Sequence, residues 1–165
     1  MAKRKTNTRL WSLVSMLVFV IFIPFAQAEQ PFDITMCFSG TTTMVSASKE
    51  LAVFSFGFKT ILRSNHENKV FDNCTGHFEG VMKVISGKRY ENAYFKLMDP
   101  DGDSIVGEVI RAGTDEGTYK FLQGTGKWKG ITGEGKSRTI GSGKPIAPDT
   151  FQMCNKIMGT FELQK

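Results

Sequence analysis

Outside its first 28 residues, the sequence lacks the excess of positive charge that attracts nucleic acids or anionic membranes. The whole chain of 165 residues carries a net charge of +5, but four of its 21 Lys and Arg residues precede residue 10, and no acidic residue precedes Glu29. The rest of the chain therefore holds 17 basic against 16 acidic residues. We expect neither nucleic acid nor an anionic membrane as a partner.

Helical periodicity, internal repeats and linker-like tracts are also missing after residue 28. All 17 glycines of the chain lie in this part, and they recur too often for a long helix. A chain of this length buries roughly two-thirds of its unfolded surface around one core. We therefore predict a leader over residues 1–28 and a single domain over residues 29–165.

Residues 1–28 have the three parts of a secretory signal peptide. A cationic start precedes an apolar run over residues 10–25, and Ala26-Gln27-Ala28 offers small residues at the two positions that a signal peptidase reads. The run is shorter than the ~20 residues of a spanning helix, and an uncleaved anchor is the alternative. We expect cleavage before Glu29, a secreted or periplasmic bacterial protein, and no stable membrane span in the mature chain.

The chain has only three cysteines, Cys37, Cys74 and Cys154. Export places them in oxidising surroundings, where two form a disulfide and one is left over. The sequence alone allows three pairings. In a closed barrel the first and last strands are neighbours, which favours Cys37 with Cys154 and leaves Cys74 as a buried apolar residue rather than a reactive or metal-bound thiol.

Alternation of apolar and polar residues dominates the rest of the sequence. Phe54, Phe56 and Phe58, for example, share one face of an extended segment. Eight to ten short strands bounded by turn residues are typical of an antiparallel sandwich or barrel. Besides the segment with Phe54, Phe56 and Phe58, the predicted strands cover roughly residues 33–39, 41–47, 70–85, 88–98, 104–112, 118–123, 127–132, 135–141 and 150–163.

The segment 105–110 is apolar on both faces. Ile105 and Val109 point one way, whereas Val106 and Ile110 point the other. A sheet with one wetted face does not need this pattern. We expect a second subunit to cover part of the outer face, giving a homo-oligomer; a loop or the N-terminal segment is the alternative cover.

Residues 130–137, with the sequence GITGEGKS, match the phosphate-binding P-loop pattern letter for letter. The pattern binds phosphate only where a helix follows the loop and presents its N-terminus. Gly141, Gly143 and Pro145 exclude a helix of useful length. We therefore predict a glycine-punctuated hairpin with Trp128 and Ile131 packed inward, and no bound nucleotide.

Two further motifs resemble metal sites. The segment 99–103 holds three aspartates, but it lacks the Gly at the sixth position and the Glu at the twelfth that an EF-hand calcium loop requires, so an acidic hairpin turn is favoured over a cation site. Cys74 and His77 have a spacing that zinc sites use, yet on a regular strand the two side chains point to opposite faces. We expect no metal and no cofactor.

The sequence leaves the catalytic residues unknown, because no serine lies in a nucleophile elbow. Glu108 is the one candidate. It shares a strand face with Val106 and Ile110, and if that face is the interior, its carboxylate is desolvated beside Arg111 or Lys96 as an acid, base or ligand anchor. The alternative is a glutamate that faces solvent.

Three runs of sequence, over residues 97–103, 121–133 and 159–163, resemble uncharacterised exported bacterial proteins, a group similar to the allene oxide cyclase-like, calycin-type barrels. The likeness covers most of the chain after about residue 35. It implies an eight-stranded barrel with an apolar cavity, in a superfamily that includes lipocalin-like carriers, plant cyclases, dirigent-type proteins and a bacterial spiro-forming cyclase. No catalytic residue of those cyclases can be placed on this sequence, so the likeness implies a fold and no active site.

We therefore predict an all-β fold: a single closed antiparallel barrel of about eight strands, wide enough for side chains or one small ligand. The expected function is binding of a small apolar or amphipathic molecule, lined by Phe54, Phe56, Phe58 and Phe95 and anchored by Glu108. A barrel filled by the phenylalanines is instead a plain scaffold. The rival functions are a cyclase or isomerase that uses one buried acid, and a structural or interaction module of the cell envelope.

Overall fold

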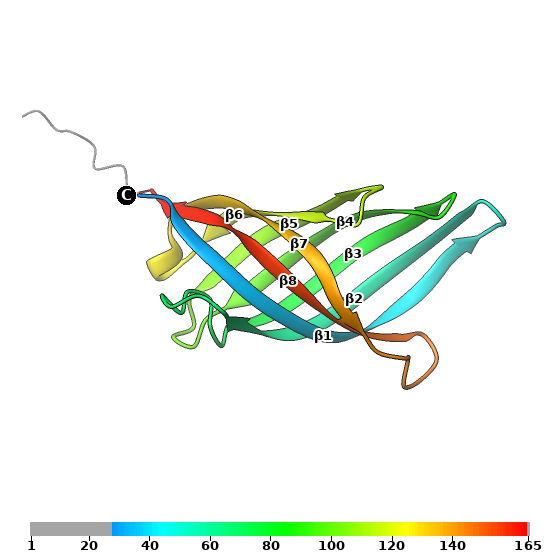
Figure 1. The fold of residues 1–165 in the computed structure, drawn as a ribbon, viewed down its shortest axis with the longest axis horizontal. Helices are drawn as coiled ribbons and strands as arrows, with labels where there is room; N and C mark the ends of the chain where they lie inside the picture. The colour runs from blue at the N-terminus through cyan, green and yellow to red at the C-terminus, as the bar shows by residue number, and fades with distance from the viewer. Residues whose placement is uncertain (1–27, 165) are drawn as a thin grey trace, which may run out of the picture.

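The computed structural model describes residues 28–164 as one closed barrel of eight antiparallel strands. Each strand pairs with its neighbours in sequence, and β1 also pairs with β8. The prediction of an all-β closed barrel is confirmed. In Figure 1 the strands run obliquely, and the start of β1 and the end of β8 lie at the same end of the barrel. The elements are β1 (Gln30–Ala47), β2 (Leu51–Ser64), β3 (Thr75–Ile85), β4 (Lys88–Met98), β5 (Ser104–Ala112), β6 (Gly117–Gly124), the 3-10 helix η1 (Gly126–Trp128), β7 (Ile131–Ser142) and β8 (Thr150–Leu163).

The period-two pattern of the sequence decides which side chains face the interior. On β5, Ile105 and Val109 are buried, whereas Val106 and Ile110 are exposed on the outer face. Burying an aliphatic or aromatic side chain of this size contributes about 1.5–3 kcal/mol, so the inward set supplies the main driving force for closure. Segment 105–110 is apolar on both faces because Val106 and Ile110 add apolar side chains to the outer face of β5.

Gly107 on β5 makes room for an aromatic ring inside the barrel. A Cβ atom at this position would lie 2.1 Å from Cζ of Phe95 and 2.5 Å from the carbonyl oxygen of Lys120. Only a residue without a side chain fits under the ring. The register against β6 shifts between Val106 and Gly107, which marks a bulge at the same point.

Residues 33–39 and 41–47, predicted as two strands, form the single strand β1. Gly40 does not interrupt it, because its backbone stays paired with Phe58 of β2 and Phe151 of β8. The predicted start of a strand at residue 70 is also wrong, since β3 begins at Thr75. The loop before it contains three non-glycine residues with positive φ, a conformation that strands do not have.

The glycine-rich run 130–137 lies mostly on β7. The predicted strands 127–132 and 135–141 are replaced by η1 followed by one continuous strand. Ser137 is paired with Ile157 of β8, so a strand stands where the P-loop pattern requires a helix. Trp128 and Ile131 are both buried, as predicted.

A disulfide joins the first and last strands of the barrel. Cys37 of β1 lies directly opposite Cys154 of β8, with the two Cα atoms 4.0 Å apart. The predicted pairing is confirmed, and Cys74 is the free, buried thiol. The two cysteines are 117 residues apart, and cross-linking such a loop removes unfolded-state entropy worth about 4–5 kcal/mol in the chain-entropy model.

The predicted leader lies outside the described residues, apart from Ala28. Residues 28–164 contain no helix with the length and hydrophobicity of a membrane span.

Candidate functional site

One half of the barrel interior is filled by aromatic side chains. This half lies at the end where β1 begins and β8 ends, since Phe32 and Phe161 are buried there. Figure 1 shows that end of the barrel at the left. Phe71, from the loop between β2 and β3, lies at its centre, with its ring 5.1 Å from that of Trp128 and 5.3 Å from that of Phe161. We call the buried set around it the aromatic plug; its members are Phe32, Phe71, Phe121, Trp128 and Phe161.

Asp99 fixes the position of Trp128 in the aromatic plug, because it accepts hydrogen bonds from the indole and from backbone amides of its own turn. Trp128 Nε1 donates to Asp99 Oδ2 over 2.8 Å, and the backbone amides of Asp101 and Asp103 donate to Oδ1. Lys127 Nζ lies 2.8 Å from Oδ2. Burial by itself would raise the pKa of Asp99, but the bonds from Lys127, Trp128 and the two amides outweigh it and hold the pKa below its usual value. The segment 99–103 is thus an acidic turn that fastens a tryptophan.

Cys74 and His77 do not come together. Cys74 is buried, whereas the His77 side chain is exposed on β3 and lies 2.9 Å from Glu79 Oε1 through Nε2. Burial, together with the negative charge of Asp99, raises the pKa of the Cys74 thiol to about 12. Among the described residues, no three His, Cys, Asp or Glu side chains are grouped so that they could hold a metal ion.

The other half of the interior contains a cavity of about 210 Å³. Its lining residues on β1 to β4 lie near the turns between β1 and β2 and between β3 and β4. Figure 1 shows these two turns at the right. The rings of Phe38 and Phe58 stack against each other on its wall, with centroids 4.1 Å apart. The apolar wall consists of Phe38, Phe56, Phe58, Met82, Val109, Phe151 and Met153, and the polar side chains are Thr42, Arg89, Glu91, Arg111, Tyr119, Ser137, Thr139 and Asn155.

Glu91 and Arg111 form an ion pair inside the barrel mouth. They face each other across β4 and β5, and Arg111 Nε donates to Glu91 Oε2 over 3.3 Å. The Arg111 side chain is 5% exposed and that of Glu91 16% exposed. Arg111 Nη1 also donates to the carbonyl oxygens of Thr114 and Asp115 in the turn after β5. The guanidinium is therefore neutralised and fixed in direction before any ligand arrives.

Tyr119 and Asn155 supply the other buried polar groups of the cavity wall. Burial and then the negative charge of Glu91 raise the pKa of Tyr119, so its phenol stays protonated and able to donate. Asn155 is hydrogen-bonded to Tyr119 and is 6% exposed, and its Oδ1 is buried without a hydrogen-bond partner. The wall thus presents one unpartnered acceptor beside the Tyr119 phenol and the apolar rings.

The four phenylalanines that were predicted to line the cavity lie in different parts of the barrel. Phe56 and Phe58 line the cavity. Phe54 lies on the same strand nearer to the β1–β2 turn and is half-buried. Phe95 stacks on Phe78 in the filled half, with ring centroids 5.1 Å apart, and borders a void of only about 20 Å³. The structure thus brings two of the four to the cavity.

The structure places Glu108 on the outer face, not in the interior as an anchor or catalytic acid would need. Glu108 shares its face with the exposed Val106 and Ile110. The inward face of β5 carries Arg111, whose partner is Glu91 and not Glu108. Among the residues that line the cavity, the carboxylate is therefore Glu91.

Sequence reasoning missed the polar residues of the cavity, although strand parity points to them. Glu91 lies two residues before the buried Ala93, and Tyr119 lies two residues before the buried Phe121. Asn155 likewise precedes the buried Ile157 by two. Residues two apart on a strand share a face, so each of these polar side chains shares the face of a core residue.

No protein-family model matches the sequence, and no curated protein matches it in sequence. Among solved structures, the pterocarpan synthase dirigent protein GePTS1 superposes with a TM-score of 0.51 and 11% sequence identity, over 83% of this chain and 93% of that one. The two chains share a fold. The pterocarpan synthase dirigent protein PsPTS1 gives a TM-score of 0.48 at 9% identity, over 85% of this chain and 98% of that one. The likeness to GePTS1 shows the barrel fold alone and carries no activity with it.

Proposed function

We propose that the protein binds one small amphipathic molecule in the cavity at the open end of the barrel. The observation that carries this proposal is Asn155 Oδ1, a buried acceptor without a partner on the wall of an apolar cavity. Leaving such a group unsatisfied costs about 1–3 kcal/mol, which a hydrogen-bond donor on a ligand recovers. The apolar body of that ligand would lie against the stacked rings of Phe38 and Phe58.

The size of the cavity and the charges on its wall limit which ligands fit it. The cavity of about 210 Å³ is below the usual range of roughly 300–1,000 Å³ for ligand pockets, which favours a single ring or a short chain. Arg111 is already paired with Glu91 and with two backbone carbonyls. Arg89 is exposed at the rim, where solvent screens its charge. We therefore propose a neutral ligand with a hydroxyl or amide donor.

Binding of p-cresol and of its hydroxyl-free analogue toluene tests this assignment. Isothermal titration should give about tenfold tighter binding for p-cresol, because only its hydroxyl can donate to Asn155. In the Asn155→Leu variant the difference between the two ligands should disappear, whereas Asn92→Leu on the outer face of β4 should preserve it. Equal affinities for the unmodified protein, or binding outside the cavity in an amide-shift map, would refute the proposal.

A ring-forming or isomerising enzyme is the second candidate. It is favoured by Glu91, Arg111 and Tyr119, which bring a carboxylate, a guanidinium and a protonated phenol to one cavity. GePTS1 is described as a synthase, and its barrel is the fold of this chain. Native mass spectrometry of protein purified from its own source would identify a retained molecule. Incubating that molecule with the protein should then yield a product of equal mass but different chromatographic retention, and Glu91→Gln should abolish the conversion.

We further propose export of the chain and a place among the exported bacterial, allene oxide cyclase-like and lipocalin-like barrels. The Cys37–Cys154 disulfide and the signal-like sequence of residues 1–28 support export. Expression in a bacterial host followed by N-terminal sequencing of the periplasmic fraction tests it. The expected mature N-terminus is Glu29; an uncleaved chain retained with the membrane would favour the anchor instead.

A further inference from the structure

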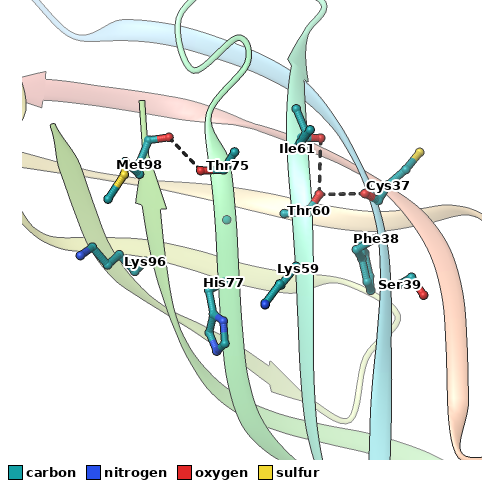
Figure 2. Close-up of a pocket in the computed structure, with 11 residues that line it drawn as sticks. Cys37, Phe38, Ser39, Lys59, Thr60, Ile61, Thr75, His77, Lys96 and Met98 are labelled. Carbon is teal, nitrogen blue, oxygen red and sulfur yellow. Dashed lines mark hydrogen bonds between the residues drawn. The ribbon is translucent and has the colours of Figure 1, made fainter. Parts of the chain in front are cut away.

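A second hollow, the outer groove, lies on the outer face of the barrel across β1 to β4 (Figure 2). It is shallow and wide open to solvent, unlike the interior cavity. Phe38 is the only residue that borders both spaces. The outer groove is thus a separate place at which a molecule can lie against the protein.

A row of basic side chains crosses the outer groove, and we call it the cationic row after its two lysines. Lys59 of β2 is paired in register with His77 of β3, and His77 with Lys96 of β4. Figure 2 shows the three side chains on the same side of the sheet. The two lysines therefore lie on the outer face with one strand, and the His77 side chain, between them.

Counter-charge is missing for two members of the row. His77 has Glu79, with His77 Nε2 2.9 Å from Glu79 Oε1. Within residues 28–164, neither Lys59 nor Lys96 takes part in an ion pair or a side-chain hydrogen bond. Two ammonium groups without an ion-pair partner therefore lie on either side of His77, and an anion placed between them would be attracted by both.

An apolar row runs beside the cationic row on the same face. Ile61, Thr75 and Met98 are paired in register across the same three strands, two residues along from the cations. Ile61 is 55% exposed and Met98 42% exposed. We propose that the outer groove binds a single-chain anionic amphiphile, with its headgroup between Lys59 and Lys96 and its alkyl chain over Ile61 and Met98.

The charge pattern around the row favours one headgroup over a polyanion. The next outward row along the strands carries Glu79 on β3, Tyr94 on β4 and Glu108 on β5, paired in register. A nucleic acid or another extended polyanion would meet these carboxylates as soon as it left the cationic row. A single carboxylate headgroup contacts the lysines alone.

Titration with decanoate tests the proposal, with the uncharged decyl maltoside and the chain-free acetate as comparison ligands. Decanoate should shift the backbone amides of Ile61, His77 and Lys96, and it should bind more tightly than either comparison ligand. Its affinity should fall about tenfold in the Lys59→Gln/Lys96→Gln double variant, which loses two exposed charge contacts. The double variant should be as thermally stable as the unmodified protein, because both lysines are exposed and neither takes part in an ion pair among residues 28–164.

Two control variants distinguish decanoate binding in the outer groove from a general effect of lost charge and from binding in the interior cavity. Lys83→Gln removes an exposed lysine from the same strand as His77 but outside the groove, and it should leave decanoate binding unchanged. Asn155→Leu alters only the interior cavity and should also leave it unchanged. Undiminished binding to the double variant, equally tight binding of acetate, or amide shifts confined to the interior cavity would each overturn the proposal, whatever the outcome of the p-cresol titration.

Discussion

Glu91 and Arg111 face each other across β4 and β5 inside the barrel, and each is the nearest counter-charge that the other has. Removing one member leaves the other charged and desolvated, whereas removing both leaves an apolar wall. We predict that Glu91→Gln lowers the free energy of unfolding by about 2–4 kcal/mol and that Glu91→Leu/Arg111→Leu loses less than the sum of its single variants. Urea denaturation of the full double-mutant cycle measures the coupling. Additive losses would show that the pair contributes nothing as a pair.

The Cys37–Cys154 disulfide fastens the seam at which the barrel closes. Replacing both cysteines by serine should lower the free energy of unfolding by about 2–5 kcal/mol, because the unfolded chain regains the freedom of a long loop. Denaturant titration with and without dithiothreitol provides the control. Dithiothreitol should lower the free energy of unfolding of the unmodified protein and leave that of the double variant unchanged. An equal decrease in both proteins would show that the disulfide is not the cause of the lost stability.

Asp99 should make the fold sensitive to acid. Its pKa is lowered in the folded protein, so its stabilising contribution is complete above the ordinary aspartate pKa of about 4 and is lost as the pH falls below that value towards the folded pKa. Asp33, whose pKa is also lowered, acts in the same direction. Thermal unfolding between pH 7 and pH 2 should show this loss, and Asp99→Asn should be less stable at pH 7 and show a shallower decline. Glu67→Gln, at an exposed loop position, should follow the unmodified protein.

The Cys74 thiol should be chemically inert while the protein is folded. Burial raises its pKa to about 12, so almost none of it is the nucleophilic thiolate at pH 8, and its side chain is out of reach of solvent. Iodoacetamide should therefore add no mass to the native protein and one carbamidomethyl group to the protein in guanidinium chloride with the disulfide intact. Rapid labelling of the native form would contradict the buried placement.

The architecture was predictable from sequence because the barrel depends on a pattern that the sequence displays directly. Alternation along residues such as Phe54, Phe56 and Phe58 indicates strands, and closure makes neighbours of the strands that carry Cys37 and Cys154. Side-chain periodicity does not predict where the side chains of a loop point. The position of Phe71 at the centre of the aromatic plug was therefore not predicted. Its positive φ and its partners from distant strands exist only in the folded chain.

The cavity was less predictable than the barrel. Segment 105–110 is apolar on both faces, so composition alone could not say which face is inside, and Glu108 was considered for the interior although it lies outside. Strand β4 is less ambiguous, because Glu91 shares its parity with the buried Ala93 and Phe95. The outer groove could not be read from one strand at all. Its cationic row arises from register, which brings together Lys59, His77 and Lys96 from three separate segments.

The aromatic plug fills the interior at one end of the barrel, and the interior cavity lies towards the other end. A ligand bound there as proposed would enter and leave at the same end, because the plug blocks the way through the barrel. The residence time of one ligand would then set the earliest moment at which the next could bind.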